Sequence, residues 1–275
     1  MKIAVLSGKG GAGKTFVSVN LAAAAERAVY IDCDVEEPNG RLFLRPTVIE
    51  RETVTRDLPQ FDKEKCIGCR KCVDFCRFNA LVLVKKKPML FDEVCHSCGG
   101  CALVCPEGAV TWHKHPVGSV EVGQREDITV VTGELNIGEA SGIPVEQKAM
   151  ELGFSAGETI IIDCPPGSAC SVMEAVNEAD YCILVAEPTA FGLHNLEMAY
   201  ELVRLLGKRC GIIINKYEAP YESLEAFCAE REIPVLCRIP YSAETARRTA
   251  AGEVAVEYDE NLRTVLRGVL REVSL

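Results

Sequence analysis

Short apolar runs alternate with longer amphipathic stretches at the start of the chain. Lys2–Leu6 ("KIAVL") predicts a buried strand that ends at a glycine-rich turn. Thr15–Arg27 predicts a helix, and Ala28–Ile31 predicts a second strand, which Asp32 closes. A strand, a loop, a helix and a second strand in this order form the parallel unit of an α/β fold.

The same pattern returns in the second half of the chain. Val120–Val131 is expected to contain a strand, and four apolar runs predict buried strands at Thr159–Ile162, Tyr181–Val185, Gly211–Ile214 and Val235–Ile239. Helices are expected at Leu193–Leu206, Tyr221–Arg231 and Glu260–Val273, the last with Leu262, Val265, Leu266, Val269, Leu270 and Val273 on one face. We therefore expect a mostly parallel sheet with helices on both faces.

A different kind of sequence separates the two halves. The α/β pattern breaks near Asp57–Pro59, and residues 60–115 are rich in cysteine and form two similar halves. We predict a small domain at 60–115, inserted into a discontinuous larger domain of residues 1–59 and 116–275.

Composition narrows the functional classes. The 275 residues are 48% hydrophobic and 25% charged, as in an ordinary globular protein, and the net charge of −10 gives no general attraction to nucleic acid. The 15 cysteines, with no recognisable signal peptide, favour a reducing cytoplasm over a disulfide framework. No run of about 18 apolar residues predicts a transmembrane helix. The C-terminal helix has no lysine or aromatic anchors, so packing against the body is favoured over stable membrane association.

A phosphate-binding loop follows the first strand. Gly8 to Thr15 ("GKGGAGKT") fits G-x4-G-K-[ST], between a strand and a helix as that motif requires. Glycines let backbone N–H groups converge on phosphate oxygens at the helix N-terminus. Lys14 is expected to reach the β- and γ-phosphates of ATP, and Thr15 to hold Mg²⁺.

Two cysteine runs carry the second kind of chemistry. Each has the spacing C-x2-C-x2-C-x3-C, which wraps a 4Fe–4S cluster in bacterial two-cluster ferredoxins. The fourth cysteine of such a run usually ligates the other cluster. The expected ligand sets are therefore Cys66, Cys69, Cys72 and Cys105 for one cluster, and Cys95, Cys98, Cys101 and Cys76 for the other. The alternative is two structural zinc sites, but zinc usually pairs two C-x2-C units across a longer gap.

The phosphate-binding loop also carries a second lysine, Lys9. The string "KGGAGKT" resembles the deviant phosphate loop of the MinD/ParA/Mrp and nitrogenase iron protein class of P-loop ATPases. That resemblance implies an ATP-sandwich dimer, in which Lys9 reaches the nucleotide of the partner subunit. A solvated charge beside the loop is the simpler alternative.

Other segments resemble the same class in the same order. "IDCDVEEPN" resembles its switch I, which implies that Asp34 positions the attacking water and that Asp32 supports Mg²⁺ or the loop. "IIIDCPPG" resembles its switch II, which implies a role for Asp163 near Mg²⁺. The resemblance further implies nucleotide contacts for a set of loop and strand-end residues: Gly8, Lys9, Gly10, Gly11, Ala12, Gly13, Lys14, Thr15, Phe16, Asn215, Lys216 and Pro240.

Taken whole, the chain resembles MinD-superfamily ATPases that carry an inserted α+β bacterial ferredoxin-like domain. In the nitrogenase iron protein a cluster ligand lies at the same offset from switch II as Cys170, so an intersubunit site is one reading and a buried thiol the other. The implied partners are an identical chain or a paralogue, and a redox protein.

Three functions follow from combining an ATP site with electron carriers. The first is an ATP-gated electron carrier that works as a dimer, which makes the most direct use of both halves. The second is an ATPase for iron–sulfur or metal-cofactor assembly, although the C-x-x-C pair of Mrp-type carriers is missing. The third is a redox-sensing regulatory ATPase of the ParA/MinD kind.

Overall fold

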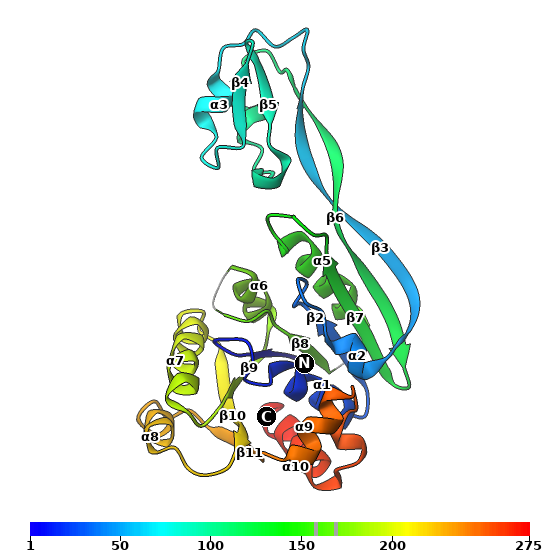
Figure 1. Cartoon of the computed structure of the whole chain (residues 1–275), viewed down its shortest axis with the longest axis vertical. Helices are drawn as coiled ribbons and strands as arrows, with labels where there is room; N and C mark the ends of the chain where they lie inside the picture. The colour runs from blue at the N-terminus through cyan, green and yellow to red at the C-terminus, as the bar shows by residue number, and fades with distance from the viewer. Residues whose placement is uncertain (157–158, 168–169) are drawn as a thin grey trace. The chain divides into compact units, whose positions relative to one another are not determined.

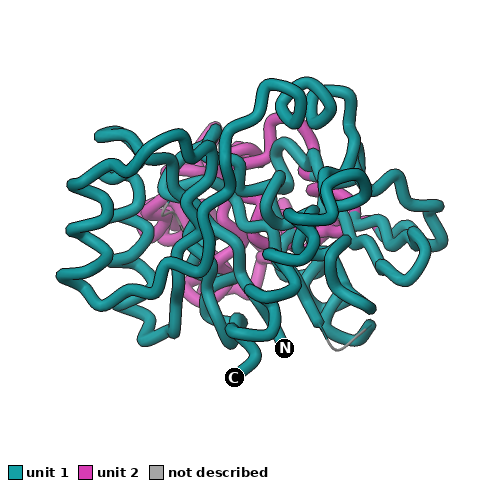
Figure 2. The backbone as a smooth tube through the Cα atoms, turned by 90° about the horizontal axis from the view of Figure 1, so that it is seen from below, with its two compact units in different colours: residues 1–52, 120–134, 146–275 teal, residues 53–119, 135–145 magenta. Residues whose placement is uncertain are grey.

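A computed structural model describes residues 1–156, 159–167 and 170–275, the side chains of residues 170 and 171 excepted. The chain divides into two compact units, coloured separately in Figure 2. Unit 1 comprises Met1–Glu52, Val120–Glu134 and Glu146–Leu275, and unit 2 comprises Thr53–Ser119 and Leu135–Val145. The insert boundaries expected from composition fall inside two long strands, and the domain limits of 60 and 115 stay a proposal.

A nine-stranded sheet organises the chain (Figure 1). Its strands are β1 (Lys2–Leu6), β2 (Ala28–Asp32), β3 (Thr47–Phe61), β6 (Val110–Arg125), β7 (Ile128–Leu135), β8 (Ile160–Asp163), β9 (Tyr181–Ala186), β10 (Arg209–Tyr217) and β11 (Val235–Pro240). The spatial order is β11-β10-β9-β1-β8-β2-β7-β6-β3. In this spatial order, each pair of neighbouring strands from β11 through β1 to β7 is parallel. The expectation of a mostly parallel sheet is therefore confirmed.

Helices of unit 1 pack on both faces of its sheet. They are α1 (Lys14–Ala24), α2 (Gly40–Leu44), α5 (Ile143–Phe154, whose first three residues belong to unit 2), α6 (Cys170–Glu178), α7 (Ala190–Leu205), α8 (Glu222–Glu230), α9 (Ala243–Ala250) and α10 (Glu260–Val273). Side chains alternate along a strand, so Ile3 and Val5 point to the face that α1 and α10 cover. Ala4 and Leu6 are also fully buried and point to the opposite face, on which α6 contacts β1 and α7 contacts β9.

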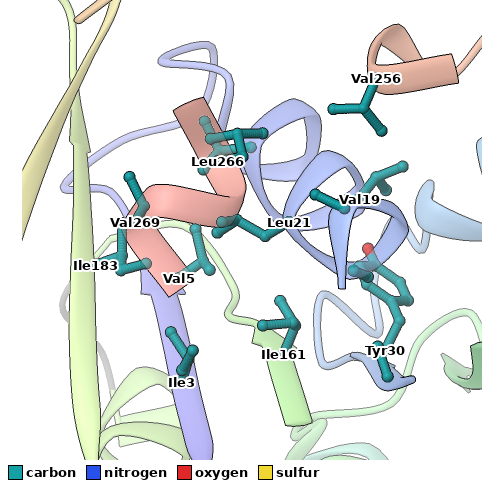
Figure 3. Packing of buried hydrophobic residues seen from close by; sticks show 14 of the residues in the cluster. Ile3, Val5, Val19, Leu21, Tyr30, Ile161, Ile183, Val256, Leu266 and Val269 are labelled. Atoms are coloured by element: carbon teal, nitrogen blue, oxygen red, sulfur yellow. The ribbon is translucent and has the colours of Figure 1, made fainter. Parts of the chain in front are cut away.

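The core between α1, α10 and the sheet is continuous (Figure 3). Leu21 of α1 and Leu266 and Val269 of α10 meet Val5 of β1 there. The α10 helix begins where the Asp259 carboxylate accepts a hydrogen bond from the Leu262 N–H, which satisfies one free donor of the first turn. Because Leu266 and Val269 belong to this core, the apolar face of α10 packs on the body of unit 1. No helix of the described residues is long and apolar enough to cross a membrane.

Unit 2 contains the cysteine-rich segment and has a small core. It holds α3 (Lys71–Phe75), the antiparallel pair β4 (Leu81–Val84) and β5 (Lys87–Leu90), the 3₁₀ turn Asp92–Val94 and α4 (Gly100–Leu103). Lys85 and Lys86 join β4 to β5 with positive φ values of 46° and 62°, as a tight two-residue hairpin requires. Leu58, Ala80 and Cys95 form the core.

Two features differ from the expected elements. The single strand region at Val120–Val131 is a hairpin of β6 and β7, turned at Glu126 and Asp127. The sheet also has an unexpected edge strand, β3. Its first half is mostly exposed and includes the charged residues Glu50, Arg51 and Glu52, because an edge strand of a sheet needs few buried residues.

Candidate nucleotide and iron–sulfur sites

The phosphate-binding loop connects β1 to α1 and needs its glycines. Gly11 and Gly13 have left-handed φ values of 96° and 90°. A Cβ on Gly13 would lie 2.1 Å from Asn215 Nδ2, and one on Gly8 would lie 1.9 Å from the Asn195 carbonyl oxygen. The loop is therefore held against the end of β10 and against α7, where no larger residue fits.

Lys14 opens α1 and is buried in an ion pair. Its Nζ lies 2.6 Å from Asp163 Oδ1 and 3.7 Å from Asp34 Oδ2. Burial alone would lower the pKa of Lys14, but the charge and hydrogen bond of Asp163, together with the charges of Asp34 and Asp32, outweigh burial. The pKa is therefore raised and the amine stays charged. The structure thus joins the loop lysine to the proposed switch I and switch II aspartates.

Tyr30 is a site residue that the sequence did not reveal. Its hydroxyl donates to Asp163 Oδ2 at 2.8 Å. Burial raises the pKa of Tyr30 well above its ordinary value, so the hydroxyl keeps its proton and acts as a donor. A tyrosine in an apolar strand is predicted to be a core residue, and no local feature of the sequence predicts its contact with an aspartate.

Asp32 and Asp34 follow β2. The Asp32 carboxylate is fully buried and accepts the Gly40 N–H at 2.9 Å and the Asp34 N–H at 3.2 Å. Burial and the neighbouring Asp163 raise the pKa of Asp32 well above its ordinary range. Burial also raises the pKa of Asp34, although Lys14 opposes the shift. Asp32 is thus fixed in place by backbone donors, whereas Asp34 remains partly open.

The other expected nucleotide residues fall into two groups. Gly10 and Lys9 are exposed, and Lys9 Nζ lies 3.9 Å from the centroid of the Phe191 ring. Gly8, Ala12, Thr15 and Phe16 are half-buried, and Phe16 packs against the core beside α1.

Three more residues expected to contact the nucleotide, Asn215, Lys216 and Pro240, lie in the last part of β10 and β11. Asn215 is buried, and its Nδ2 donates to the Ala12 carbonyl at 2.9 Å. Lys216 donates to the Gly11 carbonyl at 2.8 Å and forms an ion pair with Glu187. Pro240 is exposed and pairs with Tyr217 in the register of β10 and β11. The structure therefore brings Asn215 and Lys216 to the loop.

Glu146, in the first turn of α5, is a second residue that the sequence did not reveal. Its side chain is buried, and Oε2 has no hydrogen-bond partner among the described residues. Burial, then the charges of Glu174, Asp34 and Glu36, raise the pKa of Glu146 to about 7. A carboxyl group that can be neutral near neutral pH thus lies within the field of the switch I aspartate.

The eight cysteines of the two runs gather into two sets of four. One cavity is lined by Cys66, Cys69, Cys72 and Cys105, and a second by Cys76, Cys95, Cys98 and Cys101. The fourth cysteine of each run thus lines the cavity of the other run. Gly100 permits this arrangement, because a Cβ there would lie 2.1 Å from the Phe75 ring of the first half.

The backbones of the two runs repeat each other. The second and fourth residues after the first cysteine are left-handed in both runs, with φ of 71° at Gly68 and Arg70, 52° at Ser97 and 77° at Gly99. Left-handed residues among right-handed ones turn successive N–H groups to the same side, as in backbone nests that bind anions and iron–sulfur clusters. Holding Arg70 and Ser97 in this conformation costs on the order of 1 kcal/mol each.

One polar group in these cavities lacks a partner. Ser97 lines the Cys76, Cys95, Cys98 and Cys101 cavity, and its buried Oγ has no hydrogen-bond partner among the described residues. In the described part of the chain, no three His, Cys, Asp or Glu side chains are placed to hold one metal ion.

Cys33, Cys164 and Cys170 lie outside the two cysteine runs. Cys33 and Cys164 are buried in unit 1 beside the switch aspartates. The side chain of Cys170 lies outside the described residues, so its reading as an intersubunit ligand stays a prediction.

Comparison with known proteins agrees with the phosphate-site geometry. The CobQ/CobB/MinD/ParA nucleotide binding domain matches residues 3–256. An uncharacterised protein of Methanocaldococcus jannaschii is 26% identical over 280 residues, which cover 100% of this chain and 96% of the relative. The cell division ATPase MinD of Pyrococcus furiosus has a similar fold, with a TM-score of 0.59, 18% identity and 98% of each chain covered.

A shorter relative concerns the other kind of chemistry. A ferredoxin of Methanocaldococcus jannaschii is 43% identical over 53 residues, which are 18% of this chain and 69% of the ferredoxin. This similarity is local and extends over a small part of the chain.

Proposed function

This chain belongs to the CobQ/CobB/MinD/ParA nucleotide-binding family, and from that premise we propose that it is an ATP-gated electron carrier with two 4Fe–4S clusters. The observation that carries the proposal is the pair of four-cysteine cavities, each built from both runs, in a chain that also has a complete phosphate-binding loop. When bound, the clusters would supply one-electron oxidation and reduction.

The nucleotide site works through an exchange of partners at Lys14. Its ammonium is held by Asp163, and binding of ATP gives it the β- and γ-phosphate oxygens in place of that carboxylate. Thr15 holds Mg²⁺, and Asp34 accepts a hydrogen bond from the attacking water. Tyr30 keeps one oxygen of Asp163 satisfied during this exchange.

The segment after Asp163 is placed to respond to the exchange. The Cys164 N–H donates to Val5 at 3.1 Å, and the Gly167 N–H donates to Ser7 at 3.2 Å, so the segment touches the strand and loop that hold the nucleotide. The Cys33 N–H donates to the Asp163 carbonyl at 3.0 Å, which joins switch I to switch II. Gating requires that these switches have a different affinity for ATP in two conformations.

Dimerisation is the third part of the proposal. Lys9 is exposed, and its ammonium lies over the Phe191 ring at the surface, from where it can reach a second nucleotide. We infer a homodimer, or a heterodimer with a paralogue, and a separate redox protein as the electron donor or acceptor.

The experiment that tests the proposal uses the whole chain, purified or reconstituted anaerobically. Iron and acid-labile sulfide are measured first, and electron transfer from the reduced chain to viologen and flavin acceptors is then followed with and without MgATP. The proposal predicts two clusters per chain and a nucleotide-dependent rate that is lost in Lys14→Ala. A fully loaded chain that binds ATP but transfers electrons at one rate in every nucleotide state would overturn it.

A further inference from the structure

Arg56 is a buried cation beside one of the two cysteine cavities. It lies in β3 within unit 2, and its side chain is 10% exposed. Its Nη1 donates to the Cys95 carbonyl, and its Nη2 donates to the Asp92 carbonyl at 2.9 Å. The guanidinium therefore holds both ends of the 3₁₀ turn that leads into Cys95.

Glu139 is the counter-ion of Arg56. Its Oε2 lies 2.9 Å from Arg56 Nη2, and its side chain is 11% exposed. Its Oε1 lies 2.7 Å from His115 Nε2, whereas its buried Oε2 makes the ion pair with Arg56 but no hydrogen bond to the described residues. Glu139 belongs to Leu135–Val145, the part of unit 2 that precedes Glu146 in the sequence.

Stability alone explains this pair poorly. A buried ion pair has a desolvation cost that often equals its attraction, and apolar residues of the same volume are commonly as stabilising. Arg56 Nε is also buried without a hydrogen-bond partner among the described residues, which adds to the cost. A cation kept at such a cost against the backbone of Cys95 suggests an electrostatic role.

We propose that Arg56 raises the reduction potential of the cluster held by Cys76, Cys95, Cys98 and Cys101, and that Glu139 opposes it. This inference rests on the proposed function, because it requires a cluster in that cavity. Reduction by dithionite adds one electron, which makes the cluster with its thiolates more negative by one charge. A fixed positive charge nearby stabilises the reduced form, and a fixed negative charge destabilises it.

The two charges predict shifts of opposite sign. Arg56→Gln removes the cation and leaves the Glu139 charge uncompensated, which lowers the potential of this cluster. Glu139→Gln leaves the cation uncompensated, which raises it. A merely structural role would disturb the cavity in both variants and would not reverse the direction. Arg56→Lys keeps the charge, and Lys114→Gln removes an exposed lysine of the same unit as a matched control.

The test is an EPR-monitored redox titration of the wild-type chain and these variants, with both clusters loaded. The signal of interest is the one that disappears in Cys98→Ser. We expect its ratio of reduced to oxidised form at fixed potential to fall at least tenfold in Arg56→Gln and to rise in Glu139→Gln. Tenfold corresponds to about 59 mV for one electron. Arg56→Lys and Lys114→Gln are expected to stay within threefold of wild type, or about 28 mV.

The outcomes distinguish a failure of the Arg56 proposal from a failure of the proposed electron-carrier function. Shifts of the same sign in Arg56→Gln and Glu139→Gln, equal shifts of both clusters, or no shift would overturn the inference and leave the electron-carrier proposal intact. A wild-type chain that takes up no cluster would overturn both. If Arg56→Gln fails to fold, Glu139→Gln and Arg56→Lys still decide, because the first must raise the potential and the second must preserve it.

Discussion

Lys14 Nζ lies 2.6 Å from Asp163 Oδ1, so the lysine of the phosphate-binding loop is held by the aspartate that ends β8. Asp163 is fully buried, and Lys14 is nearly so. A nucleotide that takes the ammonium must therefore break a buried ion pair and free a carboxylate. We propose that this exchange is how ATP alters the segment that follows β8.

Replacement of Lys14 by Met is expected to affect nucleotide affinity and stability together. Each charge-assisted contact to phosphate that is lost should cost at least about tenfold in affinity. Removal of one partner of a buried ion pair should lower the free energy of unfolding by about 3 kcal/mol at pH 8. The deficit should shrink at pH 5.5, because Asp32 and Asp34, whose pKa values are raised by burial, can then bind a proton. Urea denaturation at both pH values measures it, and a deficit that does not depend on pH would contradict the account.

Lys9→Ala is expected to spare nucleotide binding and to reduce hydrolysis. If Lys9 acts in the partner subunit, as we propose, the wild-type rate per chain should rise with chain concentration, and this rise should be absent in the variant. Phe191→Ala is the matched control, since it removes only a cation–π contact of about 0.5–1 kcal/mol and keeps Lys9. Steady-state ATPase assays over a range of concentrations check this. Unchanged turnover in Lys9→Ala would refute the action in the partner subunit.

The crossing of the two cysteine runs makes a prediction about double variants. Cys69 and Cys105 line one cavity and Cys76 lines the other. Cys69→Ser should lose about half of the iron and sulfide, because each cluster has its own four thiolates. Adding Cys105→Ser should cost little more, whereas adding Cys76→Ser should remove the second cluster. Iron and sulfide analysis with EPR checks this, and the reverse result would show that each run binds its own cluster.

Glu146 is expected to make stability fall as pH rises. Its pKa is raised to about 7 in the folded state from an ordinary 4.5, so the folded chain binds the proton more tightly. The contribution is present below about pH 4.5 and is lost as pH rises to about 7. Glu146→Gln should therefore be more stable than wild type at pH 8, by at most about 3 kcal/mol, and similar to it near pH 5.

Urea titrations of Glu146→Gln at pH 5 and pH 8 test this. Glu151→Gln is the control on the same helix, because Glu151 is exposed and its charge is screened by solvent. A variant that is equally stable at both pH values, relative to wild type, would show that Glu146 is ionised in the folded chain.

The sequence predicted the elements whose local pattern is strong. The strand at Lys2–Leu6 and the helix at Glu260–Val273 have the expected bounds, because an apolar run and an apolar face are each visible within one element. The edge strand β3 was missed because consecutive charged residues, Glu50–Glu52, interrupt it and no strand-like alternation is visible. Its partner also lies about 60 residues away in the chain. Long-range pairing of this kind leaves no local trace.

The same reasoning applies to the sites. The positions of Lys14 and the cysteine runs follow from spacing, since each motif is local. Tyr30 and Asp163 are 133 residues apart in the chain, and Arg56 and Glu139 are 83 residues apart. Taken singly, each of these residues would be predicted to be a core residue or a surface charge. Only the folded sheet shows that Tyr30 holds a switch aspartate.

We propose above all that binding of ATP at the phosphate-binding loop changes the reduction potential of the clusters. Its most direct test is an EPR-monitored redox titration of both clusters, in the loaded chain, without nucleotide and with MgATP. We predict that MgATP changes the ratio of reduced to oxidised form at fixed potential by about tenfold, or about 59 mV for one electron, for at least one cluster. The shift should vanish in Lys14→Ala. Identical titration curves with and without MgATP, in a chain shown to bind the nucleotide, would contradict the claim.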